Sequence, residues 1–175
     1  LNINVYFQNI DNDNLQRAEQ LCQKTNQFNS TTIRYSSRNL LELSKRNNYS
    51  LIVVGHNSKD QEFENMGLII LNTNYQKDSL LISLYLLSCR ILGRGIENIC
   101  FHWIAYRMRE KGYKYLKVAF KKNDRNDPFE MVIKNYKGKL NSNNEWVFDL
   151  NKHFDSKIIK KSHININDSF SSSLI

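Results

Sequence analysis

Apolar and polar residues alternate in several short stretches of the chain, and a period of two is typical of half-buried strands. In the first stretch, 1–8, Ile3, Val5 and Phe7 fall on one face. Further β-rich stretches, separated by polar segments of loop composition, cover residues 50–55, 66–71, 80–87, 115–120 and 145–150. We expect strands at these positions, and an antiparallel meander from the three that lie between 50 and 87.

Helical spacing of apolar residues marks four other segments. Asp13 and Gln16 resemble a capping box, in which side chains satisfy backbone N–H groups at a helix start. Ser36 or Ser37 can cap a second helix, and Pro128 can open the last one. The four helices are predicted over 14–24, 37–47, 96–111 and 128–136.

The order of these elements predicts an α/β (α+β) domain with helices layered on a mixed sheet. The chain has 175 residues, 41% of them hydrophobic and 24% charged, which fits one domain with one core. We expect residues 1–10 to form a connector or an edge strand and residues 11–154 to form the domain. Residues 155–175, rich in Lys, Ser and Asn, are expected to form a polar C-terminal tail.

The sequence argues against several classes of protein. The longest apolar stretch, 80–87, is far shorter than the ~20 residues that cross a bilayer, and no signal peptide follows the first residue. The three cysteines lack C-x-x-C spacing, and the four histidines lack the i, i+4 spacing of a helical zinc pair. We therefore expect a cytoplasmic protein with reduced thiols, no membrane partner and no metal site, which can be a domain cut from a longer protein.

The net charge is positive, because Lys and Arg outnumber Asp and Glu by 25 to 17. A strongly basic segment contains Arg107, Arg109, Lys111, Lys114, Lys117, Lys121, Lys122 and Arg125. Such a segment fits either a solvated face or a surface for an acidic partner, such as a carrier protein, a phosphorylated small molecule or nucleic acid. No known nucleic-acid-binding motif accompanies the charge, so we expect no nucleic-acid partner.

One glycine-containing motif lies between a predicted strand and the clearest predicted helix. Residues 90–95 read R-x-x-G-x-G, and they hold two of the six glycines, Gly93 and Gly95. Glycine at such a turn lets backbone N–H groups approach a ligand, and the helix N-terminus favours a phosphate. The motif therefore predicts an anion cradle, with a tight turn that binds nothing as the structural alternative.

This motif resembles the pyrophosphate-binding signature of the GNAT N-acetyltransferase superfamily. The resemblance implies a GNAT-like acyltransferase fold over 11–154, with a mixed, mostly antiparallel sheet flanked by helices. In that family a downstream Asn and a helix ending in a Gly-Phe pair complete the coenzyme A side, and 126–129 and 136–138 look like them, although Lys139 stands where Phe is usual. The implied cofactor-binding residues are Arg90, Ile91, Leu92, Gly93, Arg94, Gly95, Ile96 and Asn126.

A resemblance that covers nearly the whole chain is to the C-terminal region of FkbH-like proteins. It rests on KTNQFN at 24–29, RYS at 34–36 and LLSCRILGRGIE at 86–97. FkbH-like proteins pair an N-terminal HAD-superfamily phosphatase domain (subfamily IIIC) with a GNAT-like domain, and they load a glyceryl unit onto an acyl carrier protein. The resemblance therefore implies that phosphatase domain and an acyl carrier protein as partners, in polyketide biosynthesis. The paired-Asp motif of the phosphatase is absent from this chain, so we expect no phosphatase activity from it.

The same resemblance implies a substrate loop at Thr25, Asn26, Gln27, Phe28 and Asn29. A helix-terminating turn would explain these residues equally well.

Two residues are candidates for catalysis. Cys89 adjoins the cradle, where Arg90, Arg94 and the helix N-terminus would lower the pKa of its thiol and favour a nucleophilic thiolate, as a thioester relay would require. Tyr136, with Glu62 or Glu64, is the nearest acid/base candidate for transfer to an amine. The alternative for Cys89 is a buried structural cysteine, like those expected at Cys22 and Cys100.

Two functions follow from these residues. The first is an acyltransferase-type domain that binds coenzyme A, acyl-CoA or the phosphopantetheine thioester of a carrier protein. The second is a non-catalytic domain of the same fold that docks the carrier protein through its basic face.

Overall fold

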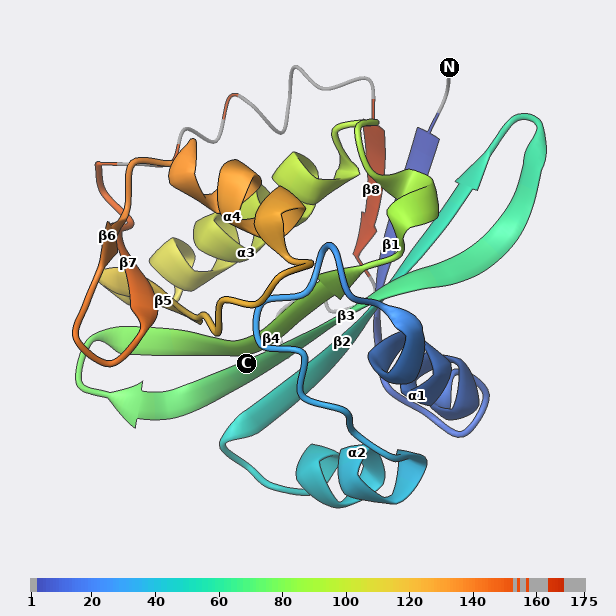
Figure 1. Ribbon diagram of the computed structural model, residues 1–175, viewed down its shortest axis with the longest axis horizontal. Helices are drawn as coiled ribbons and strands as arrows, with labels where there is room; N and C mark the ends of the chain where they lie inside the picture. Colours follow the sequence, from blue (N-terminus) through green and yellow to red (C-terminus); the bar gives the residue numbers. More distant parts are fainter. Residues whose placement is uncertain (1–2, 153, 155–156, 158–163, 169–175) are drawn as a thin grey trace.

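One mixed β-sheet runs through the centre of the protein (Figure 1), with strand order β6-β7-β5-β4-β3-β2-β1-β8. This computed structural model describes residues 3–152, 154, 157 and 164–168. The strands of these residues are β1 (Ile3–Asn9), β2 (Tyr49–Ser58), β3 (Gln61–Gln76), β4 (Ser79–Leu87), β5 (Tyr115–Ala119), β6 (Lys139–Leu140), β7 (Glu145–Asp149) and β8 (Ile164–Asp168). The helices are α1 (Leu15–Lys24), α2 (Ser37–Ser44), α3 (Ile96–Glu110) and α4 (Asp127–Lys134), with a single 3₁₀ turn, η1 (Cys89–Ile91), before α3.

Most neighbouring strands are antiparallel. The β2, β3 and β4 strands form the antiparallel meander that the sequence predicts. The β5 strand is parallel to β4, and β8 is parallel to β1. The mixed, mostly antiparallel sheet flanked by helices is therefore confirmed.

Alternating side chains of the central strands supply two separate cores. Leu51 and Val53 of β2 join a cluster with residues of α1 and α2, whereas Ile52 and Val54 join a cluster with residues of α3 and α4. Figure 1 shows the same division, with α3 and α4 on one face of the sheet and α1 and α2 on the other. Because both faces are covered, the central strands are apolar at nearly every position, as β4 illustrates.

The helix starts differ in part from the expected ones. The capping box expected at Asp13 and Gln16 is not formed, and α1 begins at Leu15. The carboxylate of Asp11 instead accepts the backbone N–H groups of Asp13 and Asn14, both at 2.9 Å. At α2 the expected cap is present, because the hydroxyl of Ser36 accepts the backbone N–H of Asn39 and the side chain of Asn39 accepts that of Ser36.

The N-terminal strand is not at the edge of the sheet. Residues of β8 pair with β1 on the side away from β2, from Ile3 opposite Ile164 to Phe7 opposite Asp168. Within the polar tail expected from residue 155 onward, residues 164–168 thus form a strand. Ile and Asn alternate in Ile164–Asp168, so the isoleucines share one face of the strand. Ile164 and Ile166 pack against the core on that face.

A bulge marks the place where β4 leaves β5. Ile70 of β3 pairs with Leu84 and Leu71 pairs with Ile82, so Ser83 is the extra residue. The pairing of β4 with β5 ends at the same level, with Ile82 opposite Val118. A bulge increases the local twist of a strand, and the remaining part of β4 diverges from β5.

We expect Leu40→Ala to lower the free energy of unfolding by about 2–5 kcal/mol, because Leu40 is completely buried in the core between α2 and the sheet. The adjacent Leu41→Ala is the matched control, since Leu41 is 38% exposed and the same deletion should change stability by less than about 1 kcal/mol. Urea unfolding followed by circular dichroism measures both. Equal losses in the two variants would contradict the assignment of the buried face of α2.

Candidate functional site

The glycine motif forms the turn between β4 and α3, as the sequence predicts. Gly93 has φ = 76° and Gly95 has φ = 85°, a left-handed backbone conformation that residues with a Cβ rarely adopt. Apart from Gly93 and its two chain neighbours, no atom of the described residues lies within 4 Å of the position that a Cβ on Gly93 would occupy. The glycines therefore serve the backbone conformation, and the turn at Gly93 is open to an approaching ligand.

The residues proposed for cofactor binding divide into two groups. Arg90, Gly93 and Arg94 are exposed and Gly95 is half-buried, so these residues form the accessible part of the cradle. Ile91 and Ile96 are buried, and Leu92 packs on the core beside them. The apolar members thus anchor the turn and do not present side chains to a ligand.

Arg90 already has a partner within the chain. Its guanidinium lies 2.7 Å from Oε1 of Glu64 in β3, and the same oxygen lies 2.9 Å from the guanidinium of Arg17 in α1. Arg90 remains exposed despite this contact. Surface ion pairs contribute little to stability, so the pairing leaves Arg90 able to exchange Glu64 for an anionic ligand.

A carboxylate of the protein also lies at the cradle. Glu97, in the first turn of α3, accepts the backbone N–H of Gly93 on Oε1 at 3.2 Å. Its Oε2 atom is buried and has no hydrogen-bond partner among the residues that the structure describes. Glu97 therefore uses one of the N–H groups that an anion would otherwise receive, and it places a negative charge near a bound phosphate.

Cys89 is exposed at the start of η1, directly after the end of β4. The structural alternative of a buried cysteine at this position is therefore wrong. Cys22 and Cys100 are buried as expected, and burial raises the pKa of the Cys22 thiol to about 11. Cys89 is thus the thiol of this chain that a substrate can reach, and its nucleophilic role stays a prediction.

Tyr136 lies after the end of α4 and reaches the first turn of α3. Its hydroxyl donates a hydrogen bond to Oδ1 of Asn98, and its ring packs on Phe101 with ring centroids 4.6 Å apart. Burial, followed by the negative charge of Glu97, holds the pKa of Tyr136 well above its usual range. The phenol keeps its proton at neutral pH, as a general acid must. Its O–H is already engaged in the hydrogen bond to Asn98.

The gap between β4 and β5 is filled by Phe28, Asn29 and Ser30. The backbone N–H of Leu87 donates to the carbonyl of Phe28, and that of Ser30 donates to the carbonyl of Tyr85, both at 3.0 Å. On the other side, the N–H of Lys121 donates to the carbonyl of Ser30 at 2.8 Å. We call residues 28–30 the wedge segment, because they replace the missing strand contact beyond Ile82.

The wedge segment gives the proposed substrate loop a structural role. Phe28 is buried in edge-to-face contact with Tyr85 and Phe129. Asn29 is completely buried; its side chain donates to the carbonyl of Thr25 and accepts the N–H groups of Thr31 and Thr32.

The remaining loop residues differ in exposure. Thr25 is buried at the end of α1, while the side chain of Asn26 contacts Arg34, and Gln27 is exposed. Of the loop, only Asn26 and Gln27 have side chains in reach of solvent, so a substrate role stays a prediction for these two.

Asn126 does not face the cradle with free polar atoms. Its side-chain nitrogen donates to the carbonyls of Asn29, at 3.2 Å, and Lys121, at 2.9 Å. Its Oδ1 accepts the backbone N–H of Asn123 at 3.0 Å. Asn126 therefore connects the loop before α4 to the wedge segment, and this geometry favours a structural role over the cofactor contact that the resemblance implies.

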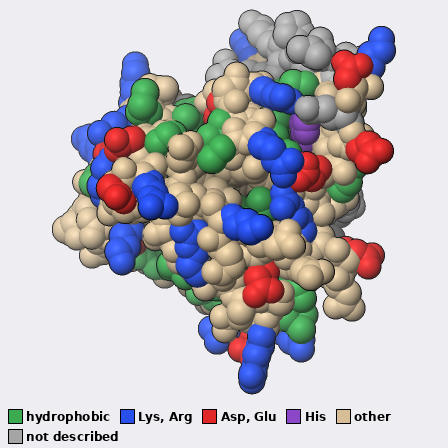
Figure 2. All heavy atoms as spheres, turned by 45° about the vertical axis from the view of Figure 1, so that its right-hand side comes forward, with side chains coloured by type: hydrophobic (Ala, Val, Ile, Leu, Met, Phe, Trp, Pro, Cys, Tyr) green, Lys and Arg blue, Asp and Glu red, His purple; other side chains and the backbone are tan. Residues whose placement is uncertain are grey.

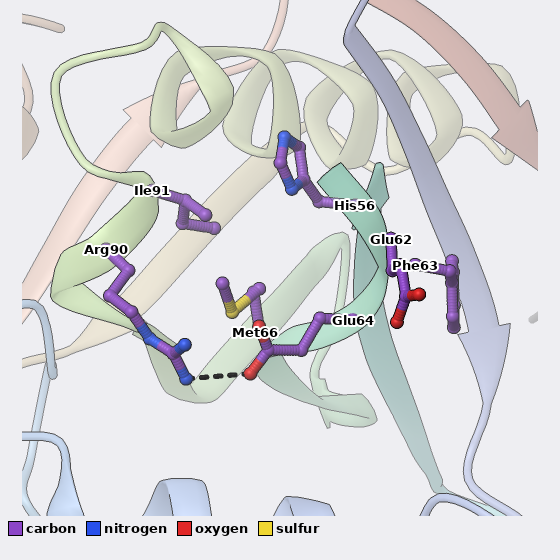
Figure 3. Close-up of a pocket in the computed structure, with 7 residues that line it drawn as sticks. All are labelled: His56, Glu62, Phe63, Glu64, Met66, Arg90 and Ile91. Atoms are coloured by element: carbon purple, nitrogen blue, oxygen red, sulfur yellow. Dashed lines mark hydrogen bonds and ion pairs between the residues drawn. The ribbon is translucent and has the colours of Figure 1, made fainter. Parts of the chain in front are cut away.

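Sequence reasoning missed one residue of the region, His56. It lies near the end of β2 and is 1% exposed. It borders a cavity of about 380 Å³ between the β2–β3 hairpin and η1 (Figure 3). Arg90 and Ile91 also line this cavity. A buried strand of residues 51–56 that ends in a histidine was the available signal. Periodicity alone does not separate such a histidine from a core residue.

The part of the chain that the structure describes has neither a metal-binding cluster nor a membrane-spanning helix. No group of three or more His, Cys, Asp and Glu side chains there could hold a metal ion. No helix there is long and apolar enough to cross a membrane.

Comparison with known proteins identifies the fold. No family model matches the chain, and no curated protein is detectably similar to it in sequence. A putative acetyltransferase of the GNAT family from Desulfovibrio desulfuricans superimposes with a TM-score of 0.62 at 9% identity, over 83% of this chain and 99% of that one.

Two further solved structures agree. The ribosomal-protein-S18-alanine N-acetyltransferase from Escherichia coli gives a TM-score of 0.59 at 7% identity, over 82% and 89% of the two chains. The GNAT domain of S. lividans PAT gives 0.59 at 13% identity, over 82% and 89%. At these identities the likeness establishes the fold alone: the chain has the GNAT fold, as its glycine motif indicated.

We expect Asn126→Asp to lower the free energy of unfolding by about 1–3 kcal/mol, because a carboxylate oxygen would replace the donor that faces two carbonyl oxygens. Asn143→Asp, at an exposed turn residue, is the matched control with the same change of charge. Thermal unfolding of both variants measures the difference. If the two variants melt at the same temperature, Asn126 does not hold the wedge segment.

Proposed function

We propose that this chain is an acyltransferase-type domain of an FkbH-like protein, which binds the phosphate-bearing arm of an acyl thioester at the cradle. The arm belongs to coenzyme A or to the phosphopantetheine of an acyl carrier protein. The observation that carries the proposal is the open turn at Gly93, at the N-terminus of α3 and beside Arg90 and Arg94. The GNAT fold shared with the acetyltransferases named above supports it.

The cradle fits a phosphate in three respects. The N-terminus of a 15-residue helix carries partial positive charge and backbone N–H groups. Two exposed arginines flank it, and among the described residues no side chain from elsewhere in the chain covers Gly93. The carboxylate of Glu97 opposes binding, and a ligand that takes the Gly93 N–H must replace that contact.

The bound thioester would supply an activated acyl carbonyl. The residues of this chain would hold its phosphate at Arg90, Arg94 and the first turn of α3, while Tyr136 keeps a proton on its hydroxyl. Cys89, exposed next to Arg90, is the nucleophile that a thioester relay would use. A glyceryl-type acyl group, a HAD-type phosphatase domain in the same parent chain and a cytoplasmic location complete the proposal, and they rest on the sequence resemblance.

Gly93→Glu should weaken acetyl-CoA binding by more than about tenfold, because a carboxylate would enter the open turn and the left-handed backbone would be strained. Gly112→Glu is a close control: Gly112 also has a positive φ, of 88°, and open space around it, but it follows the opposite end of α3. Calorimetric titration with acetyl-CoA and with coenzyme A measures both variants. Unchanged affinity of folded Gly93→Glu would refute the cradle.

A second candidate function, carrier-protein docking without catalysis, is favoured by the wedge segment. Any ligand arm that extends from the cradle along the β5-facing edge of β4 meets Phe28, Asn29 and Ser30. Those residues hydrogen-bond to β4 in place of a ligand. In this case the domain would hold the carrier protein and leave the chemistry to the phosphatase domain.

The basic segment at 107–125 supplies fewer free charges than its sequence indicates. Lys117 lies 3.9 Å from Glu145, Lys114 lies 3.4 Å from Asp78, and Lys122 contacts both Asp127 and Glu130. Figure 2 shows Lys and Arg side chains spread over one face with Asp and Glu between them. Lys121 and Arg125 are exposed and form no ion pair within the described part of the chain. They adjoin the wedge segment and the start of α4, so they are the best candidates to meet an acidic carrier.

Lys121→Glu combined with Arg125→Glu should slow association with an acidic acyl carrier protein by about tenfold at low salt and flatten its salt dependence. Lys45→Glu combined with Arg46→Glu makes the same change of charge after α2, away from the wedge segment. Stopped-flow association at two salt concentrations distinguishes them. Equal effects of the two double variants would assign the attraction to net charge and not to docking at this site.

A further inference from the structure

The wedge segment closes one route for a ligand arm that starts at the cradle. Its backbone hydrogen-bonds to β4 on one side and to Lys121 on the other. All three of its residues are at most 1% exposed. An arm that took their place along β4 would open the core and leave these backbone groups without partners, which is costly. A thioester arm therefore needs another path from the cradle.

The cavity between the β2–β3 hairpin and η1 adjoins the cradle on the β3 side of β4. Arg90 and Ile91 belong to the glycine motif and also line the cavity, whose other lining residues come from β2 and β3. In Figure 3 these two residues lie on one side of the cavity and Glu62 on the other, with Met66 between them. The volume of about 380 Å³ is in the range of small-molecule sites.

The inner wall of the cavity is apolar and carries no charge. Met66 and Ile91 are buried there, with exposed fractions of 5% and 1%. His56 lies on the same wall, and burial lowers the pKa of its imidazole, which is therefore neutral at pH 7. Such a wall fits a branched aliphatic group and disfavours an ion.

The charged residues of the rim favour a phosphate at Arg90. Oε1 of Glu64 is shared by the guanidinium groups of Arg17 and Arg90, so these two cations and one carboxylate leave one positive charge in excess. Glu64 meets Arg90 at Nη2, and Nε and Nη1 stay able to donate to a phosphate. Glu62 is exposed, and a charge in water acts weakly on its neighbours. The rim therefore offers a phosphate a site next to an apolar cavity.

The arm of the proposed thioester has its groups in the matching order. Directly after the phosphate comes the pantoyl group, in which a carbon with geminal methyls is followed by a hydroxyl and an amide. This part of the arm is neutral, branched and apolar on one side. It is thus the part that meets the wall of Met66 and Ile91 when the phosphate lies at Arg90.

From these contacts we propose that the cavity holds the pantoyl group of the arm, with the phosphate at Arg90 and the geminal methyls against Met66 and Ile91. The arm then leaves the cradle toward the β2–β3 hairpin and not along β4, so the wedge segment stays in place. This inference rests on the proposed function, because it needs the phosphate of the same arm at the cradle.

The probe is 4′-phosphopantetheine, and the methyl group of Met66 is the reporter. The full chain labelled with ¹³C-methyl methionine gives three methyl signals, from Met66, Met108 and Met131. Met66 lines the cavity, whereas Met108 is buried near the end of α3 and Met131 is exposed on α4. We expect nuclear Overhauser contacts between the geminal methyls of the bound probe and Met66, and none to the other two methionines.

Calorimetric titration of the same sample separates this inference from the proposed function. If 4′-phosphopantetheine binds but its geminal methyls make no contact with Met66, the cradle stands and the assignment of the cavity is overturned. If neither 4′-phosphopantetheine nor coenzyme A binds the folded chain, the proposed function fails, and this inference fails with it.

An arm without the geminal methyls tests the packing on the cavity wall. The analogue of 4′-phosphopantetheine with hydrogens in their place keeps the phosphate, the hydroxyl and the amide. It should bind about tenfold more weakly, because the burial of two methyl groups is lost. Equal affinity of the two arms would show that the pantoyl group does not pack on Met66 and Ile91.

Discussion

Beyond Ile82 the backbone of β4 loses β5 as a hydrogen-bonding partner, in the middle of a covered sheet where N–H and C=O groups require partners. The wedge segment satisfies them, since Phe28 and Ser30 hydrogen-bond to β4 and Ser30 also binds Lys121. The side chains of Asn29 and Asn126 hold this segment in place. That of Asn29 hydrogen-bonds to the backbone of Thr25, Thr31 and Thr32. That of Asn126 hydrogen-bonds to the backbone carbonyls of Asn29 and Lys121. These few hydrogen bonds therefore connect the end of α1, the loop before α4 and the end of β4.

The end of β4 leads directly into the cradle, so the same arrangement sets the position of the candidate chemistry. The apolar residues Ile91 and Ile96 hold the turn in the core while the two glycines expose its backbone. Glu64 then connects Arg17 of α1 to Arg90 of the turn, and Glu97 connects the start of α3 to Gly93. An anion that arrives at the cradle meets two intramolecular carboxylates that already occupy part of its contacts.

The sequence predicted those parts of the structure that depend on local spacing. The strands of the meander, the helix after Gly95 and the left-handed turn at Gly93 follow from alternation, helical period and glycine content. Asn29 and Asn126 could not be assigned in this way, because their partners are distant in the chain: 97 positions separate the two residues. The same holds for β8 and for His56, whose roles depend on which segments the fold brings beside them. Sequence spacing also overestimated the basic face, since acidic residues from other elements neutralise part of it.

The parallel pairing of β1 with β8 has a consequence for how the protein acquires its structure. The side chain of Asn165 hydrogen-bonds to that of Asn4 across 161 positions of sequence, so this pairing closes a very long loop. During synthesis the outer side of β1 stays unpaired until residues 164–168 have left the ribosome. Because contacts of large sequence separation form slowly, that open strand edge is exposed to pairing with other chains until β8 arrives.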